Sequence, residues 1–234
     1  MKARPTLRAG AACGLLAASL AAFARMAALP VLLAGCTGFR TLADPTVVIE
    51  TSGGKELGVS TDYGIAFLGR TAQAGRIDVT AWFGDGPQTE STAIEPVGGG
   101  IFTAETEIRM PEAFMNFVEP KPGDEVLVIG RHGSRIWKRT VAVKQHARVD
   151  GVLLPALREV EGAPDQIGAG VFVMKVGDPN PELVGLVSGV LELAEEGRTE
   201  RYLTVVGMRD LWRLVARRRE LDKKPPRVER EDVR

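Results

Sequence analysis

The sequence predicts an all-β fold closed by one C-terminal helix. Short apolar runs rich in β-branched residues recur from residue 47 onward, and turns rich in glycine and proline separate them. No long helical interval lies between these runs. Many short strands at close spacing are typical of a barrel or a sandwich rather than a parallel α/β sheet.

Eight segments have the length and the β-branched content of strands: residues 47–49, 64–68, 77–83, 125–129, 138–143, 170–176, 183–191 and 202–206. Turns are expected at residues 84–87, 96–100, 121–124 and 177–181. The C-terminal helix is predicted from an apolar stripe with arginines on its other faces, formed by Met208, Leu211, Trp212, Val215 and Leu221. It should end before Pro225.

The N-terminus has the pattern of an export signal. Lys2, Arg4 and Arg8 precede an alanine- and leucine-rich stretch at residues 9–33, and residues 1–35 contain no acidic side chain. The sequence Leu33-Ala34-Gly35-Cys36 resembles the lipobox of bacterial lipoprotein signals. This resemblance implies that the Cys36 thiol carries a diacylglyceryl group and that Cys36 becomes the first residue of the mature protein. The alternative is an ordinary signal peptide, or an amphipathic anchor, with a coincidental cysteine.

These observations predict four parts: a signal peptide at residues 1–35, a lipidated tether at 36–46, a β-barrel domain at 47–222 and a disordered charged tail at 223–234. Two or three acyl chains on Cys36 would hold the protein firmly at a membrane in the cell envelope. Thr37 follows the cysteine, whereas lipoproteins retained in the inner membrane of enteric bacteria carry Asp there. The resemblance therefore favours the periplasmic face of the outer membrane.

Composition argues against several other classes of protein. The chain has 30 basic and 30 acidic residues, and four of the basic ones lie in residues 1–35, so the mature chain would be slightly acidic and no nucleic-acid partner is expected. The second cysteine, Cys13, lies in the signal, which leaves the exported body without a disulfide. His132 and His146 are the only histidines and lack metal-ligand spacing, so neither a metal nor a cofactor is expected.

Two windows of the second half resemble the trypsin-like, or chymotrypsin-fold, serine peptidases. Residues 121–133 resemble the strand that opens the second barrel of that family, and residues 165–172 with 183–189 resemble its nucleophile loop and the following strand. The resemblance covers about residues 47–222. It implies a trypsin-like double β-barrel with a C-terminal α-helix.

The same resemblance places Ile167 at the position of the serine nucleophile, followed in the loop by Gly168, Ala169 and Gly170. An isoleucine side chain has no atom that can attack a carbonyl group. The catalytic histidine of the family lies upstream of the acid and the serine, and here no histidine precedes His132. We therefore expect a chain that is not an enzyme, a degenerate peptidase scaffold that binds an envelope protein or peptide by β-augmentation.

Two alternatives remain. One is an active envelope serine peptidase with a noncanonical site, drawn from the following residues: His132, His146, Ser134, Ser188, Asp124, Asp150 and Asp165. The other is a structural envelope lipoprotein with a different β fold, such as a sandwich.

Overall fold

The structure is a computed structural model that describes residues 44–70, 75–149, 152–158, 166–175, 180–195 and 197–223. The predicted signal peptide, Cys36 and most of the tether lie outside these residues, as do Asp150, Asp165 and residues 224–234. The four predicted parts of the chain remain predictions.

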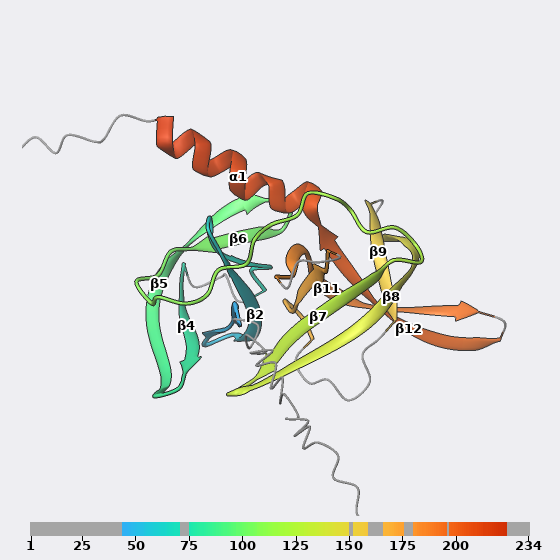
Figure 1. Cartoon of the computed structure of the whole chain (residues 1–234), viewed down its shortest axis with the longest axis horizontal. Helices are drawn as coiled ribbons and strands as arrows, with labels where there is room; N and C mark the ends of the chain where they lie inside the picture. Colours follow the sequence, from blue (N-terminus) through green and yellow to red (C-terminus); the bar gives the residue numbers. More distant parts are fainter. Residues whose placement is uncertain are drawn as a thin grey trace, which may run out of the picture. The chain divides into compact units, whose positions relative to one another are not determined.

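The first half of the described chain forms a closed six-stranded barrel (Figure 1). Its strands are β1 (Thr46–Thr51), β2 (Gly54–Thr61), β3 (Gly64–Phe67), β4 (Arg76–Phe83), β5 (Gly86–Gly98) and β6 (Ile101–Ala104). They follow one another around the barrel in the order β1-β2-β3-β6-β5-β4, and all pairs are antiparallel. Alternation along β4 explains the core, because Ile77, Val79 and Ala81 are buried while their neighbours are less so.

The second half forms another closed six-stranded barrel. Its strands are β7 (Glu125–His132), β8 (Arg135–Val149), β9 (Val152–Arg158), β10 (Gly170–Val173), β11 (Glu182–Glu195) and β12 (Arg198–Gly207), in the order β10-β11-β12-β9-β8-β7. The hairpin of β11 and β12 projects beyond the rest of this barrel (Figure 1). Two closed barrels confirm the predicted double-barrel fold and exclude the sandwich alternative.

The helix α1 (Met208–Lys223) directly follows β12. Leu211, Leu214 and Val215 are buried, whereas Trp212 and Leu221 are exposed, so the predicted apolar stripe is wrong at these last two positions. Neither α1 nor any other described segment forms a helix with the length and apolar character needed to cross a bilayer.

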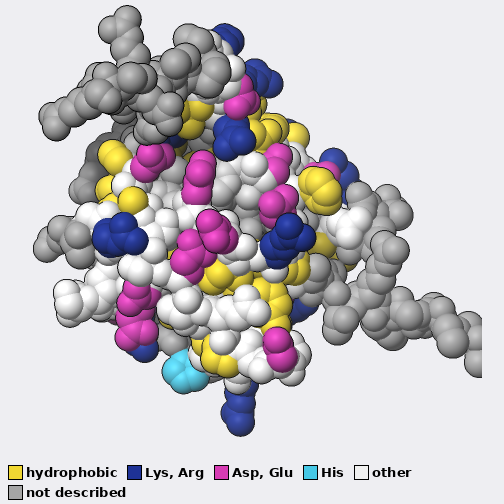
Figure 2. Space-filling model, turned by 90° about the vertical axis from the view of Figure 1, so that its left-hand side faces the viewer, with side chains coloured by type: hydrophobic (Ala, Val, Ile, Leu, Met, Phe, Trp, Pro, Cys, Tyr) yellow, Lys and Arg dark blue, Asp and Glu magenta, His cyan; other side chains and the backbone are white. Residues whose placement is uncertain are grey.

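Ion pairs attach α1 to the first barrel. Arg217 pairs with Glu95 of β5, and Arg218 pairs with Glu105 at 3.5 Å. Figure 2 shows the left-hand side of the view in Figure 1, where acidic and basic side chains are interspersed. Because these pairs are largely exposed, they orient the helix more than they stabilise it.

Candidate functional site

A pocket of about 560 Å³ opens between the two barrels. Its apolar wall includes Val48, Leu57 and Trp82 from the first barrel and Ile167 from the second. Thr89 and His132 supply polar groups at the same pocket. A concave site that combines an apolar wall with polar and charged side chains can bind a ligand and fix its orientation.

The loop at residues 166–170 forms one wall, and its backbone ties it to both barrels. Leu57 N donates to Ile167 O over 3.1 Å, and Gly168 N donates to Val187 O over 2.8 Å. Gly168 has a φ of 81°, and a Cβ built there would lie 2.1 Å from the carbonyl oxygen of Leu57. Only glycine fits this position without moving the backbone.

All four residues predicted for the degenerate nucleophile loop thus lie together beside the pocket. Ile167 is half-buried and lines it, Gly168 and Ala169 are buried, and Gly170 begins β10. The assignment of Ile167 to the nucleophile position remains a prediction. So does the lipidation of Cys36.

Arg131 fixes the wall that contains Trp82. Its buried guanidinium lies 4.6 Å from the ring centroid of Trp82, forms an ion pair with Asp44 and donates to Gly133 O over 3.2 Å. A cation held over an indole face is attracted by the ring electrons. Arg131 belongs to β7, so this contact joins the second barrel to the first.

Charged side chains surround the pocket. Lys55 Nζ lies 2.9 Å from Glu50 Oε2, and the Glu56 side chain is buried at the wall.

Away from the pocket, burial raises the pKa of Asp62, and burial together with the charge of Asp62 raises the pKa of Tyr63. Nowhere in the described ranges do three His, Cys, Asp or Glu side chains gather in a way that could hold a metal ion.

The other described candidates for a noncanonical catalytic site all belong to the second barrel. His132 ends β7 at the pocket, and His146 belongs to β8. The Ser188 hydroxyl contacts Thr204 O at 3.1 Å, and Asp124 accepts a hydrogen bond from Lys121 N in its own turn. Ser188 and Asp124 are therefore used within the second barrel's own structure.

Sequence reasoning missed Arg70. This exposed residue follows β3, and its Nη2 reaches across to donate to the carbonyl oxygen of Ser188 in β11. Ser188 directly follows Val187, which binds the 166–170 loop. Because the partners are 118 positions apart in the chain, no local pattern in the sequence could have indicated this contact.

Two closed six-stranded barrels followed by a C-terminal helix define the trypsin-like double-barrel fold. No protein-family model matches the chain, and no curated protein sequence matches it. The likeness to known proteins is found among solved structures.

The MamO protease domain from Magnetospirillum magneticum is 16% identical, with a TM-score of 0.54 over 74% of this chain and 97% of that one. The Rv3671c protease of M. tuberculosis, in an inactive form, is 16% identical, with a TM-score of 0.53 over 76% and 90% of the two chains. The HtrA-type protease AlgW, solved with a tripeptide, is 12% identical, with a TM-score of 0.53 over 72% and 58%. These similarities show a shared fold.

The comparisons contradict our prediction that the chain is not an enzyme, because the three solved structures just described are proteases and a fourth match is a serine endoprotease from Yersinia pestis. That prediction depended on one loop position and on the order of the histidines. Isoleucine at position 167 excludes a nucleophile at that position alone. The isoleucine does not exclude a serine or threonine hydroxyl at another position as the nucleophile.

Proposed function

We propose that this chain is a lipid-anchored protein of the cell envelope that binds an extended segment of another polypeptide between its two barrels. The observation that carries the proposal is the pocket beside Ile167, to which both barrels contribute. An apolar side chain of the partner would fill the space beside Trp82. The polar groups of Thr89 and His132 would bind its backbone.

The strand β11 supports the same proposal, since an extended partner segment gains affinity when its main chain pairs with an available strand edge. Val190 on this strand is exposed. The AlgW structure, which shares the fold, was solved with a tripeptide.

A pair of tryptophan substitutions tests peptide binding. Thr89 lines the pocket, and its hydroxyl lies 2.9 Å from that of Thr80. Thr89→Trp would fill the pocket and should abolish binding of envelope peptides in a pull-down assay. Gln88→Trp is the matched control, because Gln88 is exposed on the opposite face of β5 and should leave binding intact. Equal binding by both variants would show that the pocket is not the site.

The anchor is tested separately. We expect the full-length chain to incorporate labelled palmitate and to fractionate with the outer membrane. Cys36→Ser should remove both properties without changing peptide binding. Labelling that persists in this variant would exclude Cys36 as the lipid attachment site.

A second candidate function is that of an active envelope peptidase, which is favoured by the proteases that share the fold, a serine endoprotease among them. Labelling of the purified chain by a fluorophosphonate probe, followed by mapping of the modified residue, distinguishes the two candidates. A modified serine supports the peptidase. Peptide binding without labelling or cleavage supports the binding protein.

A further inference from the structure

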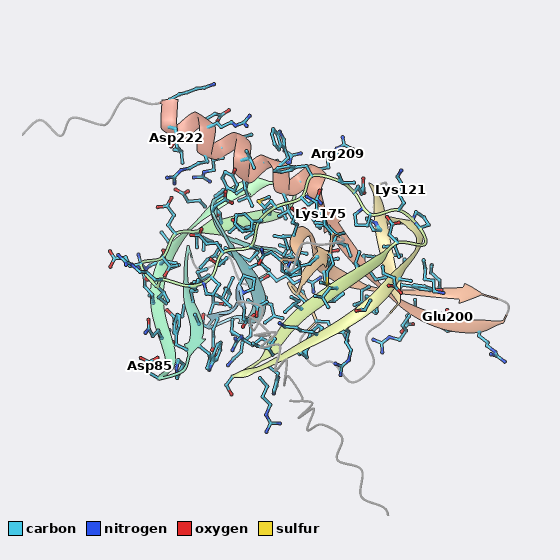
Figure 3. The ribbon with its side chains drawn as sticks, viewed as in Figure 1. Asp85, Lys121, Lys175, Glu200, Arg209 and Asp222 are labelled. Carbon is cyan, nitrogen blue, oxygen red and sulfur yellow. The ribbon has the colours of Figure 1, made fainter. Side chains whose placement is uncertain are left out.

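The edge of β11 is occupied along only part of its length. β10 pairs with β11 from Glu182 to Leu186, and Val187 N donates to Ala169 O. From residue 188 to residue 195, the described strands pair with β11 on its β12 side alone. This leaves an edge along the projecting hairpin, whose outer part carries Glu200 (Figure 3), that can accept an additional strand.

Arg70 lies at the inner end of this edge. Its Nη2 donates to Ser188 O, and a Cβ built on Gly189 would lie 3.8 Å from the same nitrogen. The side chain is exposed, and no carboxylate among the described residues lies within ion-pair distance of it. A guanidinium has five N–H groups in a planar fork, so most of them remain for a ligand.

The direction of the strands decides which end of a ligand would reach Arg70. β10 runs antiparallel to β11 and begins with Gly170 opposite Leu186. A peptide pairing antiparallel with residues 188–195 would run toward the start of β10. Pairing therefore has to stop there, and a peptide whose chain ends at this point has its C-terminus beside Arg70.

We infer that Arg70 binds the free C-terminal carboxylate of a peptide that pairs with the edge of β11. This inference rests on the proposed function and deepens it, because it names the class of polypeptide that would pair with the β11 edge; Arg70 and residues 188–195 are not among the residues that line the pocket. Charge complementarity and the fork geometry of the guanidinium both favour a carboxylate. β10 and Ala169 occupy the edge of β11 from Glu182 to Val187, so a peptide cannot continue its pairing past Ser188. This favours a chain end over an internal acidic side chain as the group that binds Arg70.

The test compares degenerate libraries of short peptides on the full-length chain in detergent, with recovered peptides identified by mass spectrometry. One library has free carboxyl ends, one has amidated ends, and one is amidated with an internal glutamate. We expect the free-acid library to bind about tenfold more tightly than either amidated library, as for a hydrogen-bonded ion pair at an exposed site.

Arg70→Gln should abolish this preference. Arg76→Gln is the matched control, because Arg76 is another exposed arginine of the first barrel whose Nη2 donates to a backbone carbonyl, that of Ser91, at 2.8 Å. This variant should keep the preference.

Each other result overturns the inference. Equal binding of acid and amide peptides, still abolished by Thr89→Trp, refutes the role of Arg70 and leaves the proposed function standing. Equal binding of the free-acid and internal-glutamate libraries refutes the chain end as the ligand. No binding of any library refutes both the inference and peptide binding.

Discussion

Glu90 is a single side chain that links two parts of the first barrel and makes stability depend on pH. Its Oε2 accepts hydrogen bonds from the Thr106 hydroxyl at 2.5 Å and from Glu107 N at 2.8 Å. The Thr106 bond is the main cause of its lowered pKa, with the backbone N–H groups adding to it. A carboxyl group with a lowered folded-state pKa stabilises the protein above its unfolded pKa, and this contribution is lost as the pH falls through the folded value.

We therefore expect Glu90→Gln to be less stable than the parent at about pH 7, with the difference shrinking below about pH 4, where the parent carboxylate becomes protonated. Urea unfolding of both proteins across this range measures it. Thr106→Val, which removes the main cause, should reproduce the effect. A difference that stays constant with pH would show that the Glu90 charge is not involved.

At the scale of elements, the sequence predicts strands that contain apolar runs rich in β-branched residues, and it misses β5, which is mostly polar. Ile77 and Val79 make β4 recognisable, whereas β5 is mostly exposed and is held by its pairing with β4 from Arg76↔Ala93 to Phe83↔Gly86. β2, β6 and β9 were also missed; β9 contains Pro155, which is unusual inside a strand. The pattern of apolar residues along a segment does not identify a strand that is stabilised mainly by pairing with neighbouring strands.

The 166–170 loop shows what a motif can and cannot predict. The resemblance located the loop, and the structure places it beside the pocket. Trp82, Arg70 and Arg131 became site residues only through contacts between distant segments. The role of such residues depends on how the two barrels meet, which the local sequence does not encode.

The Gly168 turn gives a prediction at the same scale. Gly168→Ala should lower the free energy of unfolding by about 2–4 kcal/mol, because a Cβ would clash with Leu57 O and the positive φ is itself strained. Gly197→Ala separates the two causes: its φ is 77°, close to the 81° of Gly168, and a Cβ there meets nothing within 4 Å. That control should lose only about 1–2 kcal/mol. Equal losses in chemical denaturation would show that the contact with Leu57 can relax.

On the scale of the whole molecule, the pocket depends on how the barrels are joined. Besides Leu57 and the 166–170 loop, the segment between β6 and β7 crosses from one barrel to the other: Ala113 N donates to Ser60 O and Asn116 N donates to Leu183 O, each over 2.8 Å. Arg131 of the second barrel adds a buried charge where the two barrels meet, beside Trp82 of the first barrel. A ligand seated between the barrels would therefore depend on residues that do not touch it.

The ion pair of Arg131 and Asp44 tests this dependence. The side chains are only 3% and 12% exposed, so Arg131→Met should cost about 3 kcal/mol by leaving the Asp44 carboxylate without its cation. Adding Asp44→Asn should recover about 1 kcal/mol or more of that loss in a double-mutant cycle, since the two residues act as a unit. Lys55→Met is the control, because the Lys55–Glu50 pair is 65% and 46% exposed and should change stability by less than about 1 kcal/mol. Equilibrium denaturation of the parent, the two single variants of the pair, their double variant and Lys55→Met decides the matter. If Arg131→Met is no more destabilising than Lys55→Met, the barrels are held together without this charge, and peptide binding should survive its removal.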